Sequence, residues 1–372
     1  MSNVPLNDLK RIATDFGDDV MAPALEAMRS GWWLNGTRTK AFCEAFGSYV
    51  GAAHCIGVAN GTDALEIAFR ALLAVRAPKG REVVTVANAG GYSAVAARLA
   101  GLTPVYADIE EASQLVSIDS VLSCVGVETA CVVITHLYGG AVDVPRLRER
   151  LDAAGHSHVA IVEDCAQAHG ARVDGRRVGS LGTIATFSFY PTKNLGAFGD
   201  AGCVVTNDAD LATAVDRLRQ YGWTAKYEIE HPFGRNSRMD EVQAAILMAL
   251  LPGLDAANER RVAILDRYSE AAGKTVRPVR PAGDTVAHLA VVLAEDREGL
   301  RRAMTDAGVA TDIHYPILDV DQPAWKNLPF REAPGGLVVC RESLPRLLTL
   351  PCFPTMREDE IGSVCRVLSA WT

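Results

Sequence analysis

The sequence predicts an α/β fold: a large domain with a mostly parallel sheet covered by helices on both faces, and a smaller C-terminal α+β domain. Three observations favour this fold. Short apolar runs alternate with helical patterns from about residue 60, as in parallel sheets buried on both faces. Two long helical patterns follow, and a shorter mixture of strands and helices comes after them. The 372 residues are enough for about two domains.

Six apolar runs are the predicted strands of the large domain. They cover residues 82–86, 103–109, 130–139, 158–165, 183–190 and 202–207. Helices are expected between them, among others over 62–74, 143–154 and 208–220. Because continuously apolar strands separated by helices are typical of α/β proteins, a largely parallel sheet is expected.

The region after the sixth strand is expected to connect the domains. Apolar residues at spacings of three and four over 240–272 indicate two helices that are joined near Pro252 and Gly253. A helix over 295–307 and a last helix near 357–370 then belong to the smaller unit. We therefore divide the chain into a large domain over 1–250, which includes the N-terminal segment, and a small domain over 251–372.

Composition excludes several classes of partner. The chain carries 37 Lys and Arg against 45 Asp and Glu, a net charge of -8, so general attraction to nucleic acid or to an anionic membrane is not expected. No signal-peptide pattern or membrane-spanning run is visible, which predicts a cytoplasmic protein. The nine cysteines lack CxxC pairs and are interpreted as buried free thiols, so no metal site is predicted.

A lysine and an aspartate at two predicted strand ends indicate the chemistry. Ligands of open α/β sheets bind outside the carboxyl ends of the strands. Lys193 follows the apolar strand "TFSFY", where desolvation lowers the pKa of an amine and prepares it to attack a carbonyl. Asp164 ends the strand "HVAIVED" and suits the acid that keeps a pyridinium nitrogen protonated. This pair points to pyridoxal 5'-phosphate (PLP).

A phosphate site is expected at the start of the helix over 62–74. In "VANGTDAL", Asn60 and Gly61 are expected to make a turn and Thr62 to cap the helix, whose N-terminal N–H groups attract anions. Thr62 and Ser188 are the candidate hydroxyl donors. His136, at another strand end, is either a functional or a structural histidine. Each of these motifs alone is a weak indication of a PLP site. Their joint order along the chain, with the phosphate cap first, then Asp164, Ser188 and Lys193, is a much stronger one.

These motifs resemble the DegT/StrS family of sugar aminotransferases, which have the PLP-dependent fold type I of aspartate aminotransferase. The matching stretches are "SGWWLNG", "NGTDAL", "GLTPVYADI", "THLYGG", "EDCAQAHGA", "FSFYPTKNLGAFGDAG", "GRNSRMDEVQAAIL", "DIHYP" and "LPCFP". They span nearly the whole chain in order. The resemblance implies that Lys193 forms the Schiff base with PLP and that Asp164 pairs with the ring nitrogen.

The resemblance also implies roles for further residues. The residues expected at the cofactor are Gly61, Thr62, Asp63, Tyr92, Gln167 and Ser188. Among them, Gln167 is expected to lie by the ring hydroxyl. The residues expected toward the sugar are Trp33, His314 and Tyr315. Asn236 in "GRNSR" is expected to reach the phosphate of a neighbouring subunit, which implies a homodimer with shared active sites. Where many relatives carry a Thr-aromatic pair that stacks on the cofactor, this chain has Ala89 and Gly90, and Tyr92 is the nearest substitute.

The predicted function is PLP-dependent transfer of an amino group, from glutamate, to a nucleotide-linked keto sugar in amino-sugar biosynthesis. The stretch "LRQYGWTAKYE" resembles members that act on 3-keto-6-deoxyhexoses. Two alternatives are a sugar dehydratase of the same fold, in which the resemblance predicts histidine in place of Lys193, and a non-catalytic PLP-binding regulator, which has no need of a proton-shuttling amine. The sequence has no GxGxxG motif at a strand-to-helix turn, which argues against a nicotinamide-dependent enzyme.

Overall fold

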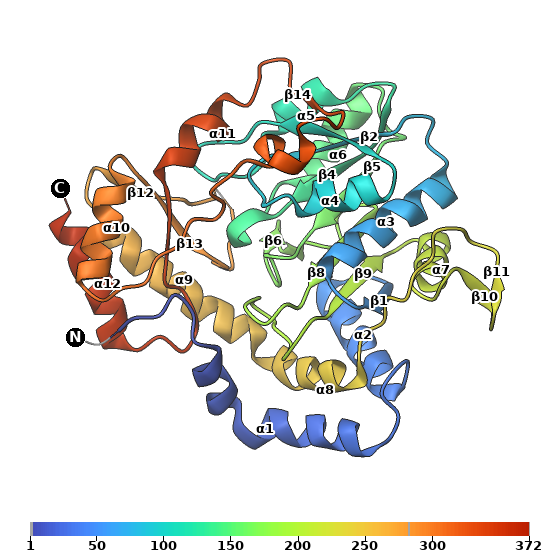
Figure 1. The fold of residues 1–372 in the computed structure, drawn as a ribbon, viewed down its shortest axis with the longest axis horizontal. Helices are drawn as coiled ribbons and strands as arrows, with labels where there is room; N and C mark the ends of the chain where they lie inside the picture. The colour runs from blue at the N-terminus through green and yellow to red at the C-terminus, as the bar shows by residue number, and fades with distance from the viewer. Residues whose placement is uncertain (1–2, 282, 372) are drawn as a thin grey trace.

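A large mixed sheet forms the centre of the protein (Figure 1). The computed structural model describes residues 3–281 and 283–371, and within them this sheet has eight strands in the order β1-β9-β8-β5-β4-β2-β3-β14. The strands are β1 (His54–Val58), β2 (Glu82–Val86), β3 (Thr103–Ala107), β4 (Thr129–Thr135), β5 (Ala160–Asp164), β8 (Ile184–Ser188), β9 (Gly202–Thr206) and β14 (Arg331–Glu332). Neighbours from β8 to β14 pair in parallel, whereas β9 is antiparallel to both β8 and β1.

The largely parallel sheet predicted from the sequence is confirmed, and each of the six expected runs overlaps one of its strands. Two strands were not anticipated, β1 and the two-residue β14. The antiparallel direction of β9 has a simple cause, because a loop without a helix connects β8 to β9, and the chain returns beside the strand that it has just left.

Helices cover both faces of this sheet. They are α2 (Thr37–Val50), α3 (Gly61–Arg76), α4 (Tyr92–Leu99), α5 (Ile118–Cys124), α6 (Val144–Ala153), α7 (Ala209–Leu218) and α8 (Glu241–Leu250), and α1 (Leu9–Arg29) packs against α8 outside this layer (Figure 1). Side chains of α3, α4 and α7 pack with Val83 of β2, whereas α5 and α6 pack with the next residue, Val84. Because successive strand residues face opposite sides, each apolar strand is buried on both faces.

The C-terminal third forms a second, smaller core. Its antiparallel sheet has the order β12 (Val276–Pro278), β13 (Ala290–Ala294) and β15 (Leu347–Leu350). Its helices are α9 (Leu254–Ala271), α10 (Arg297–Asp306), α11 (Val338–Ser343) and α12 (Glu358–Ala370), and α9 leads from α8 toward α10 and α12 in Figure 1. The division of the chain at residue 250 stays a prediction, and β14 beyond it pairs with β3 of the large sheet.

Short elements complete the described chain. They are the hairpins β6 (Arg172–Val173) with β7 (Arg176–Arg177) and β10 (Trp223–Ala225) with β11 (Glu228–Ile229), and the 3-10 turns η1 (Leu137–Gly139), η2 (Leu251–Gly253), η3 (Asp319–Asp321), η4 (Pro323–Trp325) and η5 (Leu344–Arg346). The turn η2 joins α8 to α9 at the predicted Pro252 and Gly253. No helix among the described residues combines the length and the apolar character that crossing a membrane requires.

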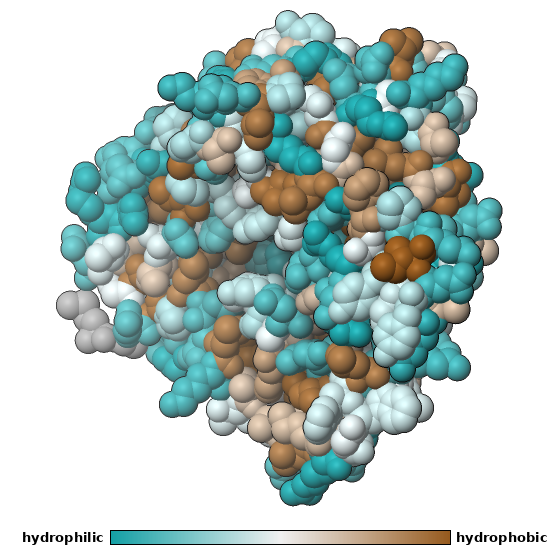
Figure 2. Space-filling model, turned by 45° about the vertical axis from the view of Figure 1, so that its right-hand side comes forward, coloured by the Kyte–Doolittle hydropathy of each residue, from teal (hydrophilic) through white to brown (hydrophobic). Residues whose placement is uncertain are grey.

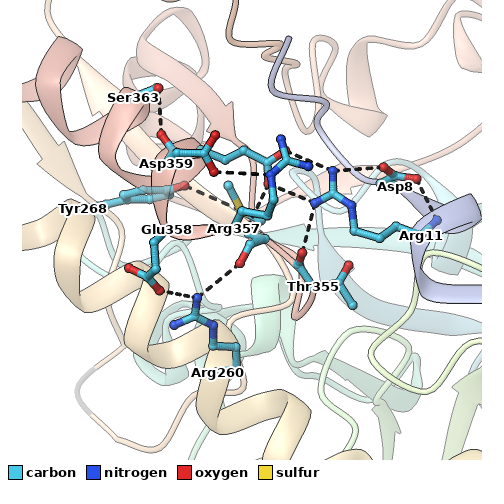
Figure 3. A network of polar contacts seen from close by, with 11 residues as sticks. Asp8, Arg11, Arg260, Tyr268, Thr355, Arg357, Glu358, Asp359 and Ser363 are labelled. Atoms are coloured by element: carbon cyan, nitrogen blue, oxygen red, sulfur yellow. Dashed lines mark hydrogen bonds and ion pairs between the residues drawn. The ribbon is translucent and has the colours of Figure 1, made fainter. Parts of the chain in front are cut away.

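The N-terminal segment is bonded to the C-terminal core (Figure 3). Arg11 of α1 donates two hydrogen bonds to the fully buried carboxylate of Glu360, at 2.9 and 3.0 Å, and a third to the carbonyl of Thr355. Arg357 also contacts Glu360, through its backbone N–H at 2.8 Å and its guanidinium at 2.9 Å. The first turns of α1 are therefore fixed by a buried ion pair to residues more than 340 positions away.

Replacing Arg11 is expected to destabilise the protein without touching the large sheet. In Arg11→Met, the aliphatic stem is retained but the buried Glu360 carboxylate keeps only Arg357 as a cationic partner, and losing the charged hydrogen bonds from Arg11 costs about 1.5 to 3 kcal/mol of unfolding free energy. Urea denaturation at a fixed protein concentration measures the loss. The exposed Lys10→Met is the control. An equal midpoint for both variants would contradict the assignment.

Candidate active site

A cavity of about 430 Å³ opens at the carboxyl ends of the large-sheet strands. It is lined by Asn60, Gly61, Thr62, Leu65, Ala89, Tyr92, Thr135, Leu137, Asp164, Ala166, Gln167, Ser188, Tyr190, Lys193 and Asp200. Because β1 and β8 are both antiparallel to β9, they run in one direction, and β8 is parallel to β5 and β4. The sheet topology therefore brings together seven of the predicted site residues.

Lys193 and Asp164 face this cavity from two strand ends. Lys193 lies in the loop after β8, where its backbone N–H donates to the carbonyl of Tyr190 at 2.8 Å. Burial lowers the pKa of Lys193 to about 8, and the negative charge of Asp164 opposes this shift. About a tenth of the Lys193 side chains are therefore the free amine at pH 7, far more than for an ordinary lysine, and a nucleophilic lysine requires this form.

Asp164 is an under-bonded buried carboxylate. Burial raises its pKa, although the N–H of Ala166 and the charge of Lys193 act in the opposite direction. Its hydrogen bonds are long, 3.2 Å from the N–H of Ala166 and 3.4 Å from the hydroxyl of Thr135. A carboxylate with only weak donors in a buried site fits a cationic N–H partner, such as a protonated pyridine nitrogen.

The low pKa of Lys193 predicts how the cofactor-free protein takes up PLP. Only the neutral amine attacks an aldehyde, so the rate should rise about tenfold per pH unit up to about pH 8 and then level off. Rapid-mixing absorbance measurements from pH 6 to 10 provide the test. A rate that still climbs tenfold per unit above about pH 9.5 would indicate an ordinary, solvated lysine.

The start of α3 and the end of β8 form a cradle that suits a phosphate. A Cβ on Gly61 would lie 2.6 Å from Cβ of Ser188, so only glycine permits this close approach. One correction concerns the cap of this 16-residue helix. Asn60, not Thr62, is the N-cap, because its Oδ1 accepts from the N–H of Asp63 at 2.8 Å. Thr62 instead lies in the first turn and lines the cavity beside Gly61.

Asp63 and Asn236 lie outside the residues that line the cavity. The carboxylate of Asp63 pairs with Arg235 at 2.7 Å, and Arg235 also reaches Glu66 at 2.8 Å. The ion pair places the segment that carries Asn236 beside the start of α3. The side chain of Asn236 itself is exposed in the single chain. The predicted roles of Asp63 toward the cofactor and of Asn236 toward a neighbour stay predictions.

Gln167 is fixed by two tyrosines. Its Oε1 accepts from the backbone N–H of Tyr138 at 2.7 Å, and its Nε2 donates to the hydroxyl of Tyr315 at 3.0 Å. The hydroxyl of Tyr138 in turn donates to the carbonyl of His314. Tyr315, expected toward the sugar, is therefore bonded to a residue of the cofactor cavity.

Two tyrosine rings pack beside the loop in which Ala89 and Gly90 replace the Thr-aromatic pair of many relatives. Ala89 and Tyr92 both line the cavity, and the Tyr92 ring lies edge-on to Tyr315 with centroids 6.1 Å apart. Gly90 has φ +76°, and a Cβ there would meet the Tyr315 ring at 2.9 Å. The chain thus places an aromatic wall at this side of the cavity, and the stacking of Tyr92 on a cofactor remains a prediction.

The other two residues predicted to face the sugar do not line the cavity of the single chain. The Trp33 ring is 59% exposed, and its indole N–H donates to the carbonyl of Met28 at 3.0 Å. Nδ1 of His314 lies 3.0 Å from the hydroxyl of Thr349. Their roles toward the sugar stay predictions.

His136 is a structural histidine. It is fully buried, its Nδ1 accepts from the N–H of Val142 at 3.1 Å, and its Nε2 lies 3.1 Å from Oε2 of Glu163. Burial alone would raise the pKa of Glu163, but the hydrogen bonds from His136 and the N–H groups of Gly179 and Gly182 lower it. Cys165 lies close enough to join these two as metal ligands, but the hydrogen bonds already occupy their ligand atoms.

Several residues of the cavity were not predicted as site residues. Thr135 contacts Asp164. Tyr190 and Asp200, which precede and follow Lys193 in the same loop, also line the cavity. The sequence signal for Thr135 is its position at the end of β4, one residue before His136. Asp200 follows the glycine-rich part of the loop and carries no comparable signal.

Comparisons with known proteins agree with this geometry. The model of the "DegT/DnrJ/EryC1/StrS aminotransferase family" matches residues 15–369. The Erythromycin biosynthesis sensory transduction protein EryC1 of Saccharopolyspora erythraea is 37% identical over 99% of both chains. The dTDP-3-amino-3,4,6-trideoxy-alpha-D-glucose transaminase of Streptomyces venezuelae is 36% identical over 99% of this chain and 96% of that protein.

Solved structures of two similar proteins share the fold of this chain along most of its length. DesV of S. venezuelae in complex with a ketimine intermediate has a TM-score of 0.92 at 35% identity, covering 100% of this chain and 99% of that one. NtdA from Bacillus subtilis with bound cofactor PMP has a TM-score of 0.88 at 27% identity, covering 99% and 85%. The fold is thus PLP-dependent fold type I. The chain belongs to the DegT/DnrJ/EryC1/StrS aminotransferase family.

Proposed function

We propose that this enzyme uses PLP to move an amino group from glutamate to the keto group of a nucleotide-linked sugar, with a 3-keto-6-deoxyhexose as the acceptor. One observation carries the proposal: the amine of Lys193, the carboxylate of Asp164 and the Gly61, Thr62 and Ser188 cradle line one cavity. The name of the S. venezuelae relative, a dTDP-3-amino sugar transaminase, supports the acceptor class.

The chain supplies each function that such a transfer needs. When bound, PLP provides the electron sink that stabilises negative charge at the carbon bonded to nitrogen. Asp164 would keep the ring nitrogen protonated, and Gln167 would lie by the ring hydroxyl. The N–H groups at the start of α3, with Thr62 and Ser188, would hold the phosphate. Lys193, released on exchange with the donor amine, would carry the proton between the donor α-carbon and the cofactor carbon.

The direct test is amination of defined sugars. Purified protein with PLP and glutamate is incubated with 3-keto and 4-keto nucleotide sugars, and mass spectrometry identifies the aminated product. We expect a product from the 3-keto-6-deoxy compounds. Amination of 4-keto sugars alone would overturn the acceptor assignment. Loss of water without amination would favour a dehydratase, and absence of turnover with PLP bound would favour a regulator.

We also propose that the enzyme is a homodimer in which each active site uses residues of both subunits. Large apolar side chains are exposed along α1 and just after it: Met21, Leu25, Met28, Trp32 and Trp33. On the face drawn in Figure 2, hydrophobic residues lie among hydrophilic ones at the surface. Apolar side chains gathered on one helix and the adjoining loop fit an interface between subunits. The exposed Asn236 fits a residue that acts in the neighbour's site.

Mixed dimers are expected to recover activity if the sites are shared. Lys193→Ala and Asn236→Asp proteins should each be nearly inactive, the second because a carboxylate would face the phosphate. Refolding an equal mixture gives about half mixed dimers, and in each of these both lesions fall in one site while the other is intact. About a quarter of all sites should therefore be active.

Activity of the refolded mixture is compared with wild type refolded in parallel. If Asn236 acts within its own chain, every site of a mixed dimer carries one lesion. A mixture that stays inactive while wild type recovers fully would exclude the shared site.

A further inference from the structure

A largely buried hydrogen-bond network surrounds the residue that follows the lysine, and this residue does not line the cofactor cavity. Its centre is Asn194, the residue after Lys193. The Asn194 Nδ2 donates to Oδ1 of Asn258 at 2.7 Å and to the carbonyl of Val286 at 2.9 Å. Its Oδ1 lies 2.9 Å from Nδ1 of His288 and accepts from it. Three partners thus hold this carboxamide in one orientation.

Asn258 extends the network to the segment that carries Asp164. Asn258 is 5% exposed, and its Nδ2 donates to the carbonyl of His169 at 2.8 Å. Gly170 follows with φ +96°, which favours glycine, and a Cβ there would lie 2.5 Å from the Tyr49 hydroxyl and 3.0 Å from the Asn258 Nδ2. One side chain of α9 therefore connects the loop after β8 with the loop after β5.

His288 contributes the only side-chain donor to Asn194 among the described residues. It is 6% exposed and lies before β13, and the adjacent backbone packs so closely on Gly139 that a Cβ there would meet the His288 N–H nitrogen at 2.7 Å. Burial, with the charges of Lys193 and Arg261, lowers the pKa of His288 well below its ordinary value. The imidazole is neutral at physiological pH and donates through Nδ1.

We propose that Asn194 is a positioning residue for Lys193, and that His288 and Asn258 fix its carboxamide. Lys193 has to stay within reach of the cofactor carbon, and its backbone is anchored on one side by the Tyr190 carbonyl. The Asn194 side chain supplies the second anchor and ties it to the Asp164 segment through Asn258. Correct placement matters because a displacement of about 1 Å costs roughly 100-fold in rate.

The proposal rests on the proposed function, so the first measurement requires no sugar. PLP capture by Lys193 in the cofactor-free protein is followed by absorbance and by borohydride labelling of the peptide that contains Lys193. In Asn194→Ala, capture at pH 8 should slow about 10- to 100-fold, and kcat for transamination should fall similarly. KM for the sugar should change less than about threefold, because Asn194 does not line the cofactor cavity.

Substitutions of His288 separate positioning from packing. In His288→Asn, the side-chain amide takes the place of Nδ1 and still donates to Asn194, so capture and kcat should stay within about threefold of wild type. In His288→Gln, the amide lies where Nε2 was, Asn194 loses its donor, and both quantities should fall about tenfold or more. Asn207→Ala, which removes a side-chain bond to the backbone of Ala53 far from this loop, is the control.

The outcomes are distinct. Equal capture rates in folded wild type, Asn194→Ala and His288→Gln would overturn the positioning role, as would lower melting temperatures without a change in capture. Slow capture in the two variants with no product from any sugar would leave the positioning role standing and refute the proposed acceptor. A wild-type protein that does not capture PLP at Lys193 would overturn both proposals.

Discussion

Lys193→Ala protein is expected to fold normally and to lose transamination almost completely. The lysine has two tasks in the proposed reaction, covalent capture of PLP and proton transfer, and proton transfer alone contributes about 10²- to 10⁴-fold in rate. No second amine lines the cavity described here to replace it. Lys193→Arg should fail equally, because a guanidinium stays protonated at every practical pH and cannot attack an aldehyde.

The measurement combines turnover with chemical labelling. Wild type with PLP should be yellow, and borohydride should fix the cofactor to the peptide containing Lys193, whereas Lys193→Ala should give no label. Lys40→Ala, which removes an exposed lysine 3.9 Å from Glu44, should label and turn over like wild type. A label on another lysine of the wild type would refute the assignment.

Strong local patterns made most helices and strands predictable from the sequence. The helices expected over 62–74, 143–154, 208–220, 295–307 and 357–370 all appear within two residues of the predicted limits. β14 was not predictable, because two residues carry no periodicity and this strand exists only through pairing with β3. The direction of β9 likewise depends on how the loop that carries Lys193 folds back, and apolar content does not reveal this.

Site residues were predictable where they follow a strand or begin a helix. They were less predictable where contacts between residues far apart in the sequence determine their position. Gly61, Ser188, Asp164 and Lys193 meet because parallel strands end at one edge of the sheet. The cap of α3 was misassigned because Asn and Thr are both good N-caps, and only the bond from Asp63 distinguishes them. The Tyr315 contact with Gln167 joins residues 148 positions apart, so no local pattern announces it.

The name of one relative bears on the regulator alternative. The EryC1 relative is named as a sensory transduction protein, and its 37% identity extends over almost the whole chain. Residues of this chain nevertheless favour catalysis. A protein that only binds PLP needs the phosphate cradle and Asp164, but it has no need of an amine whose pKa is lowered to about 8. The Lys193 experiments therefore discriminate catalysis from binding.

Asp164→Asn is expected to keep the fold and lose most activity. An amide has the shape of the carboxylate but no charge, so it cannot keep a ring nitrogen protonated. Loss of a charged hydrogen-bond partner is worth about 1.5 to 3 kcal/mol, or roughly 10- to 100-fold weaker PLP binding. The loss in kcat should be larger than the loss in binding, because the charge matters most when negative charge develops on the cofactor.

A second consequence of Asp164→Asn concerns Lys193 in the cofactor-free protein. The charge of Asp164 raises the pKa of Lys193 against the effect of burial, so the amide variant should have a pKa below about 8. The pH at which PLP capture levels off should therefore move down, and capture at pH 7 should become faster even though the captured cofactor turns over poorly. Asp119→Asn, at an exposed carboxylate that pairs with Arg150, should behave as wild type in both measurements. Near-normal turnover of Asp164→Asn with an unchanged capture profile would mean that another residue serves the ring nitrogen, because a neutral Asp164 partner predicts changes in both.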